Sequence, residues 1–173
     1  TWTLVLLPAE EEHRHEYVRI LSPRIVEPRI GQVTTLPPSA DPFAFYRQKT
    51  RNLVRKSLRQ GLEEAVTDAD WAWDFLAETH AQNIGALGGR SKPRAHFAAL
   101  KQTLSQRRLA VALDAGTPVA AMLTVRFNGT VEYLVPAVRP EHRPRQPLSF
   151  LIHHAMEAAI AGGARAWNWG GTW

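Results

Sequence analysis

The sequence predicts an α/β (α+β) fold, a mixed sheet with an antiparallel meander, a crossover helix and flanking helices. Residues 130–138 and 165–171 have the β-branched and aromatic composition of strands, and an amphipathic helical pattern separates them. Two strands that share a sheet and are joined by one helix favour parallel pairing with a right-handed connection. Upstream, the turn signals Asp114-Ala115-Gly116 and Asn128-Gly129 separate three apolar strands and predict two hairpins.

The N-terminal third is predicted in less detail. Residues 1–9 suggest a short strand, residues 10–22 an exposed helix or loop, and residues 31–36 a further strand. Five prolines between Pro23 and Pro42 exclude long regular elements there. A helix is then expected from the N-cap Asp41 to Gly61, with a buried stripe and a neighbouring arginine row, Arg47, Arg51, Arg55 and Arg59. The stripe is Phe43, Tyr46, Leu53, Val54 and Leu58.

Two more helices are expected before the hairpins. Residues 62–67 alternate enough to form a strand, and Asp68 or Asp70 then caps a helix through Ile84. Its inner face holds Phe75, Leu76 and Thr79, and His80 and Asn83 lie along the edge of that face. Ser91 with Pro93 opens the next helix, which runs to about Leu104.

The crossover helix begins at Pro147 and stops at Gly162-Gly163. Its apolar spacing predicts packing on the sheet, with Phe150, His154 and Glu157 on the other face. In such sheets ligands lie at the carboxyl ends of the strands beside the helix N-terminus, here the turn of residues 139–147. The sheet-facing residues are expected to be Leu148, Leu151, Ile152, Ala155, Met156 and Ala159.

Composition limits the class of protein. The chain has 173 residues, enough for one domain with a core, and no apolar run long enough for a membrane span. The absence of cysteine excludes disulfides and thiolate ligands or nucleophiles, and the seven histidines lack metal-site spacing, so no metal is expected. No signal-peptide pattern is visible, and a cytoplasmic location is the expectation. The sequence gives no oligomeric state.

The net charge of +5 is arranged in three blocks. Residues 47–59 carry six basic and no acidic side chains, residues 60–89 six acidic and no basic ones, and residues 90–108 six basic and no acidic ones. Opposite blocks are expected to pair across adjacent elements, and an anionic ligand is the alternative. For the arginine row, the expected partners are Asp68, Asp70, Asp74 and Glu78, unless the row meets a polyanion.

Four segments in this order resemble the GNAT acyltransferase fold, and specifically its Fem-like (FemAB-type) branch. The segments are YRQKTRNLVRKSLRQGLE (46–63), HAQN (80–83), AVALDAGTPVAAML (110–123) and YLVPAVRPEHRPRQPLSFLIHHAMEAAIAGGARAWNWGG (133–171), and the resemblance covers about residues 31–171. Fem-like proteins often contain two GNAT-type halves. The resemblance therefore implies a GNAT domain over residues 37–173, with residues 1–36 as the end of a preceding half in a longer protein.

The resemblance implies transfer of an acyl or acetyl group from acyl-coenzyme A to an amine on a small molecule or peptide. A Fem-like peptidyl transferase that uses aminoacyl-tRNA is one alternative, and a non-catalytic module that binds an anionic partner is the other. In the GNAT pattern the strand before the crossover helix binds the pantetheine arm through its backbone, and the following loop cradles the pyrophosphate. The matching positions are Val135, Ala137, Val138, Arg143, Arg145 and Gln146. The loop keeps arginines but lacks the glycines of the pattern, and its prolines remove amide donors.

Catalytic and substrate residues follow from the same placement. Glu132 could accept the proton of the amine and Tyr133 could donate to the leaving thiolate, with a structural pair as the alternative. His80 is a second candidate base because histidine titrates near neutral pH, against a capping or core role. Asn83 and Trp169 are expected at the substrate side of the cleft.

Overall fold

The computed structural model of the chain describes residues 12–27 and 30–172. Residues 33–170 form one compact unit. Helix α1 (Arg14–Leu21) lies outside that unit and has no buried residue. The strand expected at residues 1–9 lies outside the described residues, and the domain boundary expected after residue 36 stays a prediction.

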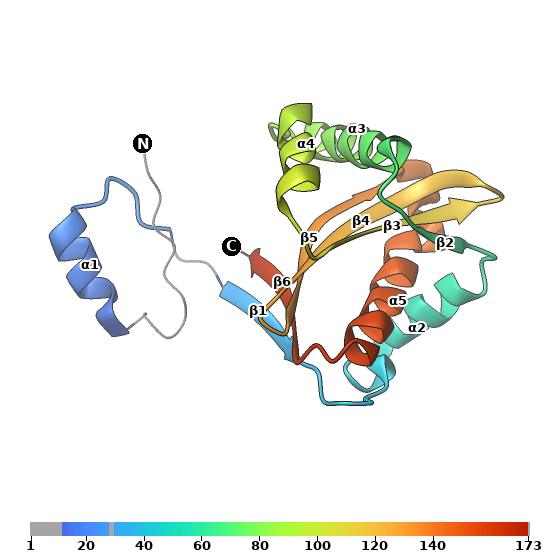
Figure 1. The fold of residues 1–173 in the computed structure, drawn as a ribbon, viewed down its shortest axis with the longest axis horizontal. Coiled ribbons are helices and arrows are strands. Elements are labelled where there is room, and N and C mark those ends of the chain that lie inside the picture. The colour runs from blue at the N-terminus through green and yellow to red at the C-terminus, as the bar shows by residue number, and fades with distance from the viewer. Residues whose placement is uncertain (1–11, 28–29, 173) are drawn as a thin grey trace. The chain divides into compact units, whose positions relative to one another are not determined.

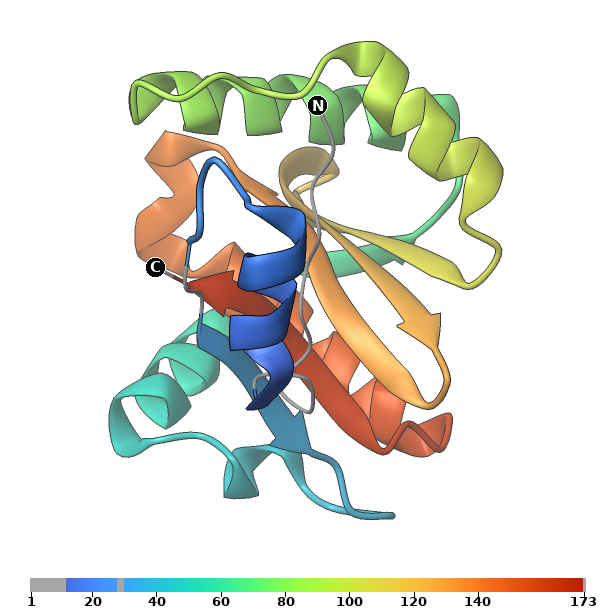
Figure 2. The same cartoon turned by 90° about the vertical axis from the view of Figure 1, so that its left-hand side faces the viewer.

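A six-stranded mixed sheet forms the centre of the fold, in the order β1-β6-β5-β4-β3-β2. Helices α3 and α4 cover one face, and α2 and α5 cover the other (Figures 1 and 2). The prediction of a mixed sheet with an antiparallel meander, a crossover helix and flanking helices is confirmed. The elements are β1 (Ile30–Thr35), η2 (Pro42–Ala44), α2 (Gln48–Leu58), β2 (Glu63–Val66), α3 (Asp70–Ala86), α4 (Arg94–Thr103), β3 (Arg107–Asp114), β4 (Thr117–Phe127), β5 (Thr130–Val138), η3 (Pro140–Arg145), α5 (Pro147–Ala161) and β6 (Ala166–Thr172).

Both predicted turns have the backbone that hairpins require. Asn128 and Gly129 have φ of 46° and 76°, and Ala115 and Gly116 have φ of 47° and 80°. These left-handed pairs match the type I′ pattern, whose twist suits the flanking strands. The strands β3, β4 and β5 therefore pair antiparallel in sequence order, whereas β5 and β6 pair parallel across α5.

The helix expected at residues 41–61 is divided. Asp41 caps only the short η2 turn, where its Oδ1 accepts from the Phe43 N–H at 2.8 Å, and α2 starts at Gln48. The side chain of Arg51 donates to the carbonyls of Phe43 and Tyr46 at 3.1 and 2.9 Å. Because the guanidinium satisfies two carbonyls at the break, the chain turns here and the helix does not continue. The expected burial of Leu58 is wrong, since it is 40% exposed.

Two further local expectations are corrected. Neither Asp68 nor Asp70 caps α3, whose N-cap is Ala69; Asp68 instead accepts from Trp73 Nε1 at 2.9 Å and pairs with Arg107. In α5, Phe150 is buried at 6% exposure although its spacing predicted the outer face. The reason is that α5 packs on the sheet and also against α2, so two of its sides are covered.

Candidate active site between β5 and β6

Strands β5 and β6 separate after a short parallel ladder. Their register pairs Thr130, Val131 and Glu132 with residues 166, 167 and 168, and within the residues that the structure describes this ladder does not continue beyond Glu132. By contrast, β5 stays paired with β4 to its last residue, Val138. The edge of β5 that faces β6 is therefore free of strand partners from Tyr133 onward, which leaves backbone groups available for other partners.

A β-bulge lies where the separation begins. Leu123 of β4 pairs with Val135 and Thr124 pairs with Tyr133, so Leu134 is the extra residue of β5. Because side chains alternate along a strand, one extra residue moves later side chains to the other face. Tyr133 accordingly packs in the core beneath α5, whereas Val135 packs in the core beneath α3.

The far end of this free edge is already occupied. The side-chain amide of Asn83 donates to the carbonyl of Val138 at 2.9 Å, and its oxygen accepts from the Val138 N–H at 3.0 Å. The Arg139 N–H donates to the carbonyl of Val119 in β4. Because the backbone groups of successive residues in a strand point to opposite edges, those of Val138 and Pro136 point away from β4. Proline has no N–H, and Asn83 uses the one at Val138. Asn83 was expected to contact substrate and Val138 the donor; in this structure they bind each other.

The N-terminus of α5 closes the same end of the site. Gln146 is its N-cap, with φ of 60°, and no side chain caps the helix. The first helical bond runs from the Phe150 N–H to the carbonyl of Gln146 at 3.2 Å. The amides of Leu148 and Ser149 in the first turn have no intrahelical acceptor, so they can bind an anion together with the positive end of the helix dipole.

The two arginines of the preceding turn have different surroundings. Arg143 is exposed, as predicted. Arg145 is only one-third exposed, pairs with Asp114 and donates to the carbonyl of Gln60 at 2.6 Å. Arg145 therefore joins the β3–β4 hairpin, the end of α2 and the η3 turn, and in this structure its guanidinium has structural partners in place of an open position for phosphate.

The candidate catalytic residues lie on different faces of the sheet. Tyr133 packs on the α5 side, where burial raises the pKa of its phenol to about 12. Glu132 alternates to the α3 side, is half-buried, and has no hydrogen-bond or ion-pair partner within the described residues. His80 is half-buried on α3, and its ring lies 5.7 Å from that of Phe97. No contact joins His80 to Glu132 in the described part of the chain.

Aromatic rings line the α5 side where the strands separate. The ring of Trp169 lies 5.9 Å from that of Tyr133 and 5.6 Å from that of Trp167, and its Nε1 donates to Thr34 at 3.0 Å. Trp167 is fully buried, and its Nε1 has no acceptor. Trp169 is thus a wall of this region, with its polar atom bonded to β1.

A buried histidine was not predicted as functional or structural. His153 of α5 is 4% exposed, its Nδ1 lies 3.4 Å from the hydroxyl of Tyr46, and its Nε2 lies 3.6 Å from Glu157. Burial lowers the pKa of His153, and burial raises the pKa of Tyr46. No pattern in the sequence marked His153, because its burial comes from Phe43 and Tyr46, which lie more than 100 residues earlier in the chain.

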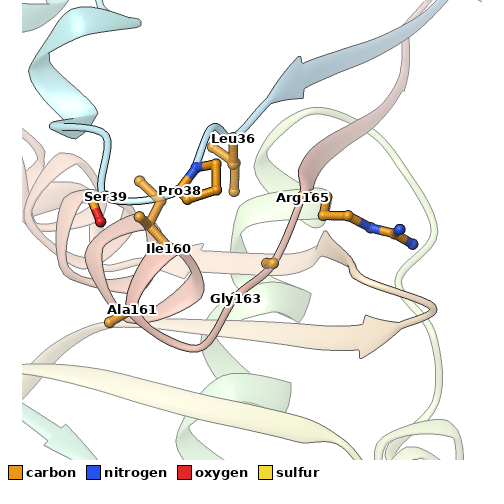
Figure 3. A pocket seen from close by; sticks show the side chains of 8 residues that line it. Leu36, Pro38, Ser39, Ile160, Ala161, Gly163 and Arg165 are labelled. Atoms are coloured by element: carbon orange, nitrogen blue, oxygen red, sulfur yellow. The ribbon is translucent and has the colours of Figure 1, made fainter.

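Two surface pockets lie away from this site. Leu36, Pro38, Ser39, Ile160 and Ala161 line a shallow pocket at the C-terminal end of α5 (Figure 3), with Gly163 to Arg165 completing its wall. In Figure 3 the side chain of Arg165 extends away from this pocket. A second pocket lies between α3 and α4 and is crossed by ion pairs. Neither pocket is lined by a residue of β5 or β6.

The charge blocks pair in a different order from the one expected for the arginine row. Five acids of the middle block pair with the block at residues 90–108: Asp74 and Glu78 with Arg94, Asp70 with Lys101, Asp68 with Arg107, and Glu64 with Arg108. The prediction that opposite blocks pair is confirmed for these two. The prediction that Asp68 to Glu78 neutralise the arginine row is wrong, because α3 faces α4 and the row lies on the opposite layer.

A mixed sheet whose parallel strands separate beside an open helix N-terminus is the architecture of the GNAT fold. A family model described as "Acetyltransferase (GNAT) domain" matches residues 44–172, and the chain belongs to this family. It is therefore a transferase domain. No curated protein matches the sequence.

Solved structures show the same fold at low identity. FemX aligns with a TM-score of 0.78 and 12% identity, over 96% of this chain and 61% of FemX. The L-PGS of Bacillus licheniformis aligns with a TM-score of 0.59 and 16% identity, over 92% of this chain and 50% of that chain. The GCN5-related N-acetyltransferase of Kribbella flavida aligns with a TM-score of 0.52 and 16% identity, over 88% of this chain and 52% of that chain. The chain thus spans about half to three-fifths of these proteins, and the likeness to FemX agrees with the expected Fem-like branch of the fold.

The described residues show neither a membrane-spanning helix nor a cluster of metal ligands. No helix among them is long and apolar enough to cross a membrane. Within the same residues, no group of three or more His, Cys, Asp or Glu side chains is placed to hold a metal ion.

Proposed function

We propose that this domain transfers an acyl or acetyl group from acyl-coenzyme A to an amine of a small molecule or peptide. The observation that carries the proposal is the separation of β5 from β6 beside the uncapped N-terminus of α5. The separation gives a thioester a path between two strands, and the first turn of α5 offers amides to a phosphate. A cytoplasmic location stays a prediction from the sequence.

The residues fit the donor in part. Arg143 and the first-turn amides of α5 suit the pyrophosphate, and Gln146 positions that turn through its left-handed backbone. The strand positions Val135 and Ala137 remain proposed contacts for the arm of the donor. Pro136 and the Asn83-bound Val138 offer no free N–H, so strand-like pairing of the arm is confined to the start of the separation.

The proposed reaction uses one group on each face of the sheet. Glu132 accepts the proton of the amine as its nitrogen forms the new bond to the acyl carbon. Tyr133 gives its proton to the sulfur as the carbon–sulfur bond breaks, and its raised pKa of about 12 keeps the phenol protonated at neutral pH. His80 is the second candidate base, and Trp169 the proposed wall for the acceptor.

A second donor is favoured by one observation. The occupied edge at Pro136 and Val138 is unfavourable for a pantetheine arm but places no restriction on an aminoacyl ester presented from outside the sheet. Aminoacyl-tRNA is therefore the alternative donor for the same transfer. The non-catalytic alternative has less support, because the chain belongs to a transferase family.

The experiment is a transfer assay with separate donors. Acetyl-coenzyme A and aminoacyl-tRNA are each supplied with a panel of amines, and release of free thiol or deacylated tRNA is followed. We expect Glu132→Gln and Tyr133→Phe to lower kcat by about 100-fold or more, as for loss of a general acid or base. Glu63→Gln, an exposed acid on β2, is the matched control. Full activity in both site variants, or no transfer from either donor by the wild type, refutes the proposal.

A further inference from the structure

One face of α2 is cationic and has no neutralising partner. Residues 47–59 contain no acid, and no ion pair joins any of their six cations to another described residue. The other two charge blocks pair with each other, as shown above. The face consists of exposed residues that recur at helical spacing: Gln48, Lys49, Asn52, Arg55, Lys56 and Arg59.

The nearby acids and one arginine have other roles. Asp41 is bonded to the Phe43 N–H, and Glu157 contacts His153 and His154. Arg51 is held by two backbone carbonyls and does not belong to the exposed face. The other cations of residues 47–59 are exposed, and among them Arg55 also lies over the ring of Phe43, with its Cζ 5.5 Å from the ring centroid. Like charges three or four residues apart destabilise a helix, and a bound anion would offset that cost.

The chemistry of this face fits phosphates better than a membrane. A helix that lies on a lipid surface needs a broad exposed apolar side, whereas α2 packs Val54 in the core and exposes a single large apolar side chain, Leu58. The exposed side offers Gln and Asn amides between Lys and Arg side chains, and these groups supply most contacts to phosphate and sugar. From Gln48 to Arg59 the face is about 17 Å long, a length over which duplex nucleic acid carries about ten phosphate charges.

The face also leads to the candidate active site. Gln60, the residue after Arg59, gives its carbonyl to Arg145 of the η3 turn. The exposed Arg143 lies in the same turn. A bound polymer that follows α2 toward its C-terminal end therefore reaches the N-terminus of α5.

We propose that the exposed face of α2 is a docking surface for nucleic acid, which it binds through the phosphodiester backbone without reading sequence. The inference goes beyond the proposed transfer reaction, since docking requires neither Glu132 nor Tyr133. Affinity falls as salt rises, because each phosphate contact releases counterions.

The test measures binding of the whole chain to a fluorescently labelled duplex RNA of arbitrary sequence, by anisotropy over a range of salt concentrations. Lys49→Glu with Lys56→Glu removes two exposed cations whose side chains make no hydrogen bond or ion pair with another residue that the structure describes. Arg90→Glu with Lys92→Glu is the matched control, because both residues are exposed, lie in the loop before α4 and change the net charge equally. Lys49→Gln with Lys56→Gln replaces the first variant if thermal unfolding shows that it does not fold.

We expect the α2 variant to bind at least tenfold more weakly and to lower the slope of log affinity against log salt by about two, while the control keeps the wild-type values. Equal losses in both variants would show attraction to net charge alone and overturn the proposal. Absent binding by the wild type, or stronger binding to anionic lipid vesicles than to RNA, would overturn it as well. Transfer from acetyl-coenzyme A is assayed separately, so the failure of docking and the failure of catalysis are distinguishable.

Discussion

Replacing Asn83 with alanine tests whether α3 closes the free edge of β5. Val138 is only 9% exposed, and Asn83 supplies a partner to both of its backbone groups, at 2.9 and 3.0 Å. A buried polar group left without a partner costs about 1–3 kcal/mol. Since the substitution leaves an N–H and a carbonyl unpaired, we expect the free energy of unfolding to fall by about 2–5 kcal/mol. This is a large share of the stability of a domain of this size.

Urea denaturation of the purified chain measures the change. Asn83→Asp should also lose stability, because one carboxylate oxygen still accepts from the Val138 N–H but the other replaces a donor and faces the Val138 carbonyl oxygen. Gln82→Ala, the adjacent exposed residue of α3, is the control and should change stability by less than about 0.5 kcal/mol. A loss below about 1 kcal/mol in Asn83→Ala would refute the reasoning, since it would mean that water satisfies Val138 as well as Asn83 does.

Three other predictions concern single positions. Gly129→Ala should destabilise the fold by about 1–2 kcal/mol, because Gly129 has φ of 76° and an added Cβ would lie 2.9 Å from Arg165 Nε. Gly85→Ala in α3 is the control, since an added Cβ meets open space there and should leave stability unchanged or raise it. Thermal unfolding measures both changes. Burial lowers the pKa of His153, so below about pH 6.5 the unfolded chain takes up a proton that the native state does not. The free energy of unfolding should therefore decrease as the pH is lowered through this range, and it should decrease less steeply in His153→Asn. Urea denaturation at several pH values measures both slopes, and equal slopes in the two proteins would contradict the prediction. Arg145→Gln should increase hydrogen exchange at residues 59–61 and 114–117, because one guanidinium holds both segments; unchanged exchange there would exclude that role.

Elements with local signals were predictable from the sequence. The Asn128-Gly129 turn and the Pro147 start of α5 each depend on the backbone preference of one or two residues, and the structure has both. The break before α2 was missed because Asp41 and Pro42 do start a helical turn, and nothing nearby in sequence shows that Arg51 will satisfy its carbonyls.

Features of the site that depend on distant contacts were not predictable. Asn83 and Val138 are separated by 55 residues, and an asparagine on a helix edge gives no signal for the strand it will reach. The bulge at Leu134 depends on the register between β4 and β5, which no local pattern specifies. The burial of Phe150 required knowing that α2 covers the second side of α5.

The short ladder between β5 and β6 has a consequence for how the sheet opens. Its three residue pairs are the only strand register that joins β6 to the antiparallel strands β2 to β5 within the described residues. The β3–β4 and β4–β5 registers each extend over eight pairs, so they should resist opening far longer than the β5–β6 ladder does. Local unfolding of this domain is therefore expected to start as a hinge between β5 and β6. The meander and both of its turns should stay intact during such an opening.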